Sequence, residues 1–110
     1  MNHFLLPCCR EAVPTPRYGD VAFSRLLAEI ERLGCARADL RAKVFGGAAV
    51  LPVGEQGDTV GALNVGAALQ ALNAHNIPVV ARRTGGQRGL FLRFHTELGR
   101  VMVRELRGEA

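Results

Sequence analysis

Two short runs, 89–95 and 100–106, in which apolar residues recur at every second position, constrain the fold of this 110-residue chain most strongly. Side chains of a strand alternate between its two faces, so such runs predict β-strands. In the first run one face carries Leu90, Leu92 and Phe94, and the other carries Phe91, Arg93 and His95. The connection, residues 96–99, has four residues and ends in Gly99, which suits the strained position of a hairpin turn. We therefore expect an antiparallel pair of strands here.

Two helices are predicted upstream, because apolar residues recur there at three- and four-residue spacing. The first follows a loop containing Pro14 and Pro16. Asp20 is expected to cap its start, and Gly34 to end it in a left-handed conformation. The second is predicted between Thr59 and Asn76, with Thr59 or Asn64 as its N-cap and Asn76 at its end. The apolar residues that give these periods are Phe23, Leu26, Leu27, Ile30 and Leu33 in the first helix, and Val65, Ala68, Leu69 and Leu72 in the second.

Further strands are expected at residues 40–45 and 77–81. For the chain as a whole we expect two helices and about five short strands. This order predicts an α/β layered fold, with both helices packed on a mixed, largely antiparallel sheet. Hydrophobic residues make up 48% of the chain and charged residues 22%, which is ordinary for a globular protein. We expect residues 1–110 to form a single domain.

The cysteines and histidines do not form the pattern of a disulfide framework or a metal site. Cys8 and Cys9 are adjacent and poorly placed to bridge each other, and Cys35 leaves an odd number. The three histidines, His3, His75 and His95, are scattered along the chain. We expect reduced thiols, no metal and no cofactor. His75 is expected to bond carbonyls at a helix end, and His95 to be exposed.

The charge of the chain and its lack of long apolar runs bear on its partners. Seven arginines and only three glutamates follow residue 81, so the net charge of +4 is concentrated late in the sequence. Few aromatic residues interleave with these arginines, so nucleic-acid binding ranks as a distant third interpretation. The absence of a membrane-spanning run or signal-peptide pattern leads us to expect a cytoplasmic protein without membrane insertion.

Five short blocks, in order along the chain, carry a family resemblance. They are Asn2-His3-Phe4-Leu5-Leu6-Pro7, Tyr18-Gly19-Asp20-Val21-Ala22, Ala42-Lys43-Val44-Phe45-Gly46-Gly47-Ala48, Val60-Gly61 with Asn64, and Gly85-Gly86-Gln87-Arg88-Gly89. Together they span nearly the whole chain, which resembles the CheD family of bacterial chemoreceptor glutamine deamidases.

The resemblance implies a layered α/β fold similar to that of certain toxin deamidases. It implies a cysteine thiolate that attacks the side-chain amide of a receptor glutamine, and a histidine, His3 in this chain, that acts as general base. The implied partners are the cytoplasmic helices of methyl-accepting chemotaxis receptors and, in some members, the CheC phosphatase. No cofactor is implied.

The chain departs from the family pattern where the chemistry is concentrated. The family's nucleophile stands in a Gly-Ser-Cys-type block upstream of the histidine, together with an assisting threonine, and only two residues precede His3 here. We therefore expect an N-terminally short member without the nucleophile. In an extended chain, Cys8 would lie about 16 Å beyond His3, outside hydrogen-bond reach.

The last block and the residues around it also depart from the family pattern. Arg83 stands where the family has an acidic residue, and Leu90 where it has arginine. An ion pair is therefore lost, or Arg88 takes over one role.

Two readings of function stay open: a chemoreceptor glutamine deamidase read from an internal start, and an inactive module that binds chemoreceptors or CheC.

Overall fold

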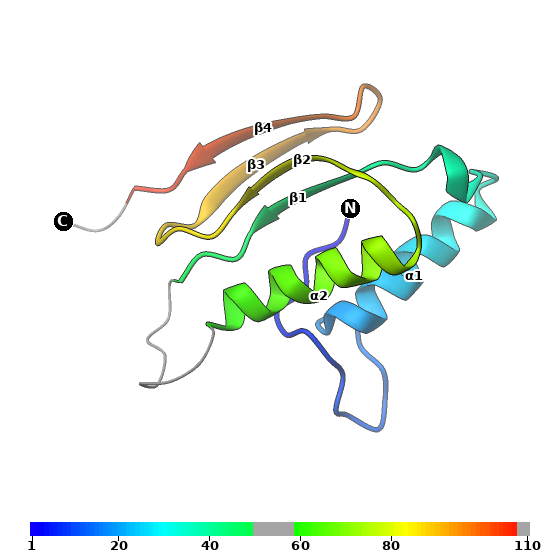
Figure 1. The fold of residues 1–110 in the computed structure, drawn as a ribbon, viewed down its shortest axis with the longest axis horizontal. Helices are drawn as coiled ribbons and strands as arrows, with labels where there is room; N and C mark the ends of the chain where they lie inside the picture. The colour runs from blue at the N-terminus through cyan, green and yellow to red at the C-terminus, as the bar shows by residue number, and fades with distance from the viewer. Residues whose placement is uncertain (50–58, 108–110) are drawn as a thin grey trace.

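The computed structural model describes residues 1–49 and 59–107 and shows a mixture of helices and strands (Figure 1). The predicted class, two helices with short strands, is confirmed, with four strands in the described residues. The elements in chain order are α1 (Gly19–Arg32), the 3-10 helix η1 (Arg37–Asp39), β1 (Ala42–Gly46), α2 (Val60–Ala74), β2 (Val79–Thr84), β3 (Leu90–His95) and β4 (Arg100–Glu105). None of the described helices is long and apolar enough to cross a membrane.

Helix α1 begins without a side-chain cap, so the prediction that Asp20 caps it is wrong. Tyr18 is the N-cap residue, and Asp20 lies inside the first turn. The backbone N–H groups of Gly19 and Asp20 donate instead to the carbonyls of Leu6 and Pro7, at 2.7 and 3.2 Å. The preceding segment thus satisfies two of the first donors of the helix, and the Val21 N–H donates to Oδ1 of Asp20 at 2.9 Å from within the first turn.

The other predicted helix boundaries are confirmed. Gly34 follows α1 with a φ of 95°, and Asn76 follows α2 with a φ of 56°. The hydroxyl of Thr59 accepts a 3.0 Å hydrogen bond from the Ala62 N–H, so Thr59, and not Asn64, caps α2. At the other end of α2, Nδ1 of His75 lies 2.8 Å from the carbonyl oxygen of Ala71.

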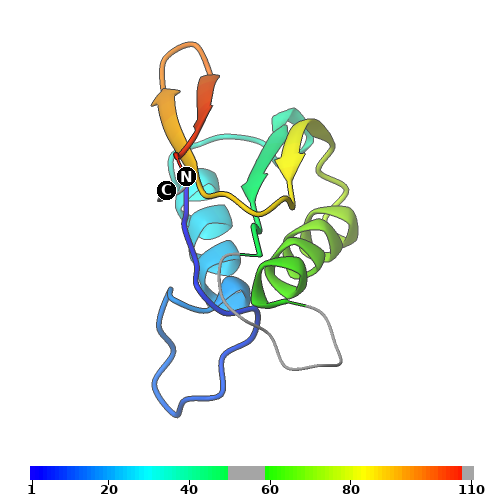
Figure 2. The same cartoon turned by 90° about the vertical axis from the view of Figure 1, so that its left-hand side faces the viewer.

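The four strands form two separate two-stranded sheets. Strands β1 and β2 are parallel, with α2 as the crossover between them, and β3 and β4 form the predicted antiparallel hairpin. The turn residue Gly99 has a φ of 72°. Figure 1 shows the strands above the helices, and Figure 2 shows that the hairpin stands apart from the β1–β2 pair. Across the two sheets the pairing is mixed, because one pair of strands is parallel and the other is antiparallel.

The buried core lies between the two helices and β1, and its centre is Leu27, Leu72 and Ile77. The partly buried residues packed against this centre are Phe23, Leu40, Ala42 and Val44. No residue of the hairpin belongs to it. The hairpin is joined to the other sheet by polar contacts: Nζ of Lys43 donates to the Gly99 carbonyl at 2.7 Å, and Arg83 pairs with Glu105 at 3.2 Å.

Candidate functional site

The segment that carries His3 lies along the start of α1. The N–H groups of Leu5 and Leu6 donate to the Arg17 carbonyl at 2.7 and 3.1 Å, and Leu6 forms a parallel β-bridge with Tyr18. With the bonds from Gly19 and Asp20, these contacts fix the backbone that directly follows the histidine. The first and second sequence blocks are therefore in contact.

Phe4 and Gly19 explain why the second block contains a glycine. Gly19 is buried, and a Cβ added to it would lie 2.8 Å from a ring carbon of Phe4. Real Cβ atoms do not approach other carbons so closely, so any side chain at position 19 would displace the ring. The residue next to His3 is thus packed on a surface that only glycine provides.

Asn64 joins helix α2 to the same segment. Its Nδ2 donates a 2.9 Å hydrogen bond to the Leu5 carbonyl, across 59 positions of sequence. Its Oδ1 is buried and accepts no hydrogen bond from the described residues. Sequence reasoning considered Asn64 only as a cap and as part of the fourth block. Its place in the fourth block was the only sequence signal that Asn64 matters, because no neighbouring residue predicts a hydrogen-bond partner 59 positions away.

A junction of glycines brings the third, fourth and fifth blocks together. A Cβ on Gly61 would lie 2.5 Å from the Gly47 carbonyl oxygen, and a Cβ on Gly47 would lie 2.3 Å from a methyl group of Val65. The backbones of β1's end and α2's start are therefore in direct contact. The Gly85 N–H donates to the Gly46 carbonyl at 2.9 Å. Gly46, Gly47, Gly85 and Gly86 all have positive φ, a conformation that glycine adopts without strain.

The five blocks thus form one connected series of contacts, and the start of α2 joins its two halves. Gly61 contacts the glycine turn after β1, and Asn64, three residues later, bonds the segment that follows His3. Residues far apart in sequence are assembled into one region by the start of a single helix.

The histidine itself is exposed, and the structure does not pair it with a cysteine. Cys9 donates its N–H to both carboxylate oxygens of Asp20, at 3.1 and 3.2 Å, and its Sγ lies 3.7 Å from the Glu11 carbonyl. Cys8 and Cys35 are exposed free thiols. Within residues 1–49 and 59–107 no hydrogen bond links a thiol to His3. His75 and His95 lie elsewhere, at the end of α2 and at the end of β3.

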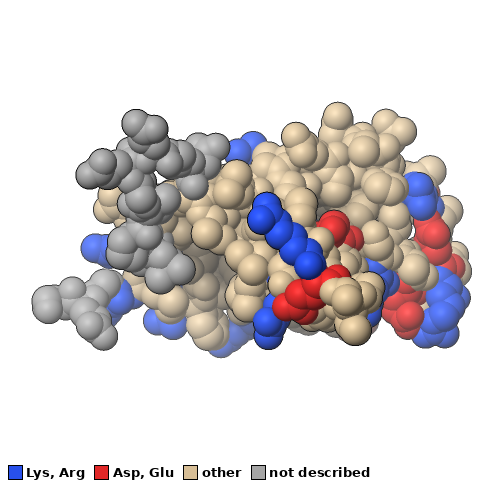
Figure 3. Space-filling model, turned by 90° about the horizontal axis from the view of Figure 1, so that it is seen from below, with Lys and Arg blue, Asp and Glu red and all other residues tan. Residues whose placement is uncertain are grey.

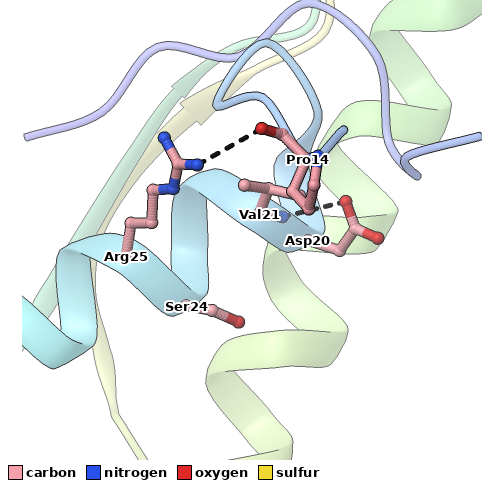
Figure 4. Close-up of a pocket in the computed structure, with 5 residues that line it drawn as sticks. All are labelled: Pro14, Asp20, Val21, Ser24 and Arg25. Carbon is pink, nitrogen blue, oxygen red and sulfur yellow. Dashed lines mark hydrogen bonds between the residues drawn. The ribbon is translucent and has the colours of Figure 1, made fainter. Parts of the chain in front are cut away.

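Tyr18 is the buried anchor of the loop between the first two blocks. Its hydroxyl donates a 3.0 Å hydrogen bond to the Glu11 carboxylate. That hydrogen bond is the main reason why the pKa of the phenol is raised above its usual value, and burial and the negative charge of Glu11 act in the same direction. The same loop is tied to α1 by Arg25, whose Nη2 donates to the Pro14 carbonyl at 3.2 Å (Figure 4).

Two hollows lie near this region, and neither contains His3. The one in Figure 4, about 330 Å³, is lined by Pro14, Asp20, Val21, Ser24 and Arg25. A groove of about 570 Å³ runs beside the glycine junction, and Thr59, Ala62, Leu69, Arg82 and Thr84 are among its lining residues. Ala62 and Asn64 are two positions apart on a helix, so they do not face the same way. The groove therefore lies on another side of α2 than the contact with Leu5.

No group of three or more metal-binding side chains occurs in the described part of the chain. The chemistry that this region offers is that of an exposed imidazole on a firmly held backbone, beside buried amide and carbonyl groups.

Comparison with known proteins gives one family. The family model described as "CheD chemotactic sensory transduction" matches residues 7–105. A protein of Rhodospirillum rubrum, named as a probable chemoreceptor glutamine deamidase CheD, is 57% identical over 106 residues, which are 96% of this chain and 60% of that protein. A protein of Anaeromyxobacter dehalogenans with a similar name is 44% identical, over 96% of this chain and 62% of its own length. One of Sulfurimonas denitrificans is 39% identical, over 94% of this chain and 68% of its own.

The chain thus spans about 60% of the length of the first two of these curated relatives. The match covers all of the second to fifth blocks and reaches the end of the first.

Proposed function

The chain belongs to the CheD family, and from that premise we propose that it acts in the deamidation of chemoreceptor glutamines during bacterial chemotaxis. The substrates in this proposal are glutamine side chains on the cytoplasmic helices of the receptors. In this proposal the protein acts in the cytoplasm, where these receptor helices lie, and the reaction requires no metal or organic cofactor.

The proposed reaction is hydrolysis of the glutamine amide by a cysteine–histidine pair. His3 takes the thiol proton, and the thiolate attacks the amide carbon. The tetrahedral intermediate expels ammonia with a proton returned from the imidazole. His3 then removes a proton from water, which attacks the acyl-enzyme and releases glutamate and the free thiol. The net change is amide plus water to carboxylate plus ammonia.

The observation that carries the proposal is the connection of the five blocks through the start of α2. Phe4 is packed on Gly19, and the Leu5 carbonyl is bonded by Asn64, so the backbone beside His3 is held by two separate helices. A general base needs such a fixed backbone, because proton transfer requires an approach to hydrogen-bond distance.

The proposal assigns the nucleophile to the part of the longer relatives that lies outside the match. Cys9 is held at Asp20 and Glu11, and neither Cys8 nor Cys9 bonds His3 in the described residues. This chain would then provide the general base and its support, and the other part would provide the thiolate.

The test is ammonia release from a receptor cytoplasmic fragment, with mass spectrometry to locate glutamines converted to glutamate. Two proteins are compared: the 110-residue chain, and a chimera that adds the unmatched part of the Rhodospirillum rubrum relative. We expect deamidation by the chimera and its loss in His3→Ala, with His95→Ala as the matched control. A chimera with unchanged activity after His3→Ala would contradict the role of this histidine.

A second candidate function is a non-catalytic module that binds chemoreceptors or the CheC phosphatase. It is favoured by the lack of any described hydrogen bond between a thiol and His3. It predicts that the 110-residue chain is retained by immobilised receptor fragment or CheC without releasing ammonia. Robust deamidation by this chain alone would exclude it.

A further inference from the structure

The outer face of the β3–β4 hairpin is a basic surface that none of the five blocks explains. The register pairs Phe91 with Arg104, Arg93 with Met102 and His95 with Arg100, and side chains of paired residues share a face. All six side chains are exposed, and none is acidic. We call these six residues the hairpin's basic face.

The two faces of the hairpin differ in character. The opposite face carries Leu90, Leu92, Phe94, Val101, Val103 and Glu105, and its apolar residues except Phe94 are half-buried. The basic face is thus the one turned to solvent. On the helix side of the molecule, by contrast, acidic and basic side chains lie next to one another (Figure 3).

We propose that the hairpin's basic face binds an acidic amphipathic helix of a partner protein. The proposal does not depend on the deamidation reaction, because it uses none of the residues assigned to that reaction.

The arrangement of side chains favours this partner over nucleic acid or a lipid surface. Phe91 is 46% exposed and Met102 57% exposed, and they lie diagonally across the two strands, alternating with arginines. Arginine, methionine and aromatic residues are the types enriched in protein interfaces. The Arg104 guanidinium lies 5.1 Å from the Phe91 ring centroid, so a cation and an apolar ring are presented together. Phe91 is the only phenyl ring on this face, whereas proteins that bind single-stranded nucleic acid stack successive bases on several aromatic side chains. Burying Phe91 and Met102 in lipid would also draw the neighbouring arginines toward the apolar phase.

The dimensions fit one helix. A six-residue strand is about 20 Å long, and two paired strands with their side chains give a face about 10 Å wide. A helix is about 10–12 Å in diameter, and about 14 of its residues span 20 Å. Carboxylates spaced at three and four residues along such a helix lie on one face, as do interspersed leucines. They would meet the arginines and the two apolar side chains together.

The test uses a labelled synthetic helix with glutamates and leucines on one face, and a matched helix with glutamine in place of glutamate. We expect the acidic helix to bind the full chain more tightly, with affinity that falls as salt rises. Arg93→Glu with Arg100→Glu should weaken binding roughly tenfold or more, because like charges then face each other. Arg10→Glu with Arg41→Glu makes the same charge change on other exposed arginines and should weaken binding less than about threefold.

Two further variants keep the result interpretable. Arg93→Gln with Arg100→Gln avoids repulsion and should still weaken binding, and Met102→Ser tests the apolar contribution; circular dichroism checks that each variant folds. Equal binding of the acidic and neutral helices, or equal effects of the two double glutamate variants, would overturn the proposal. Tighter binding of a DNA duplex or of anionic phospholipid vesicles, lost in the same variant, would overturn it in favour of that ligand.

Discussion

Gly61 at the start of α2 faces the carbonyl oxygen of Gly47 so closely that a Cβ on Gly61 would lie 2.5 Å from it. The contact is between backbones, so neither partner can move away by changing a rotamer. The glycine turn after β1 and the first turn of α2 are therefore fitted to each other.

Gly61→Ala is expected to destabilise the protein relative to Gly66→Ala on the same helix. Both substitutions gain helix propensity, but a Cβ on Gly66 meets no described atom within 4 Å. The difference isolates the clash with Gly47, which we expect to cost about 1–3 kcal/mol. Urea unfolding of the two variants measures it, and equal free energies of unfolding would show that the glycine junction yields at no cost.

Asn64→Ala is expected to loosen the segment beside His3. It removes the bond to the Leu5 carbonyl, worth about 0.5–1.5 kcal/mol, and Asn64→Asp should cost more because a carboxylate would face the same carbonyl. Hydrogen exchange should become faster at the amides of Leu5 and Leu6. Asn73→Ala, at an exposed position of the same helix, is the control and should leave these amides protected.

The only tyrosine of the chain allows a direct titration of its contact with Glu11. The Tyr18 hydroxyl donates to Glu11, so its pKa in the folded protein is above the ordinary value of 10.0. Glu11→Gln should lower the pKa toward that value, as followed by tyrosinate absorbance. An unchanged titration curve would mean that the bond does not form in solution.

The same contact gives a sign for the pH dependence of stability. The unfolded state loses the phenol proton at a lower pH than the folded state does. The stabilisation is therefore fully present below about pH 10 and is lost as the pH rises through the folded-state pKa. The difference in unfolding free energy between the wild-type chain and Glu11→Gln should shrink over this range.

The hairpin is expected to open more easily when Lys43 is replaced. Lys43→Met removes the bond to the Gly99 carbonyl and keeps an apolar stem of similar length. Its cost to global stability should be below about 1.5 kcal/mol, because a single exposed hydrogen bond contributes little. Hydrogen exchange in β3 and β4 should nevertheless increase. Arg41→Met changes a nearby exposed charge and should leave that exchange unaltered.

Local signals in the sequence predicted the helices, the hairpin and most of the turns. Thr59, Gly34, Asn76 and Gly99 take the positions expected of them, because capping and left-handed φ depend on the residue itself. Asp20 is not the N-cap predicted for α1. The carbonyls of Leu6 and Pro7, more than ten residues earlier, accept hydrogen bonds from the first two N–H groups of this helix.

Local sequence patterns could not predict how the strands pair or which distant segments are in contact. The end of β2 was expected at Ala81, before two arginines, but parallel pairing with β1 extends it to Thr84. The bond from Asn64 to Leu5 likewise depends on how α2 docks and not on its periodicity. The five blocks indicated which segments belong to the family pattern without showing which of them touch.

The position of Gly61 and Asn64 on adjacent turns of one helix makes α2 a mechanical link. A small rotation or slide of this helix would change the glycine junction and the hold on Leu5 at the same time. A displacement of the turn after β1 would therefore also alter the backbone beside His3, through α2 and the side chain of Asn64.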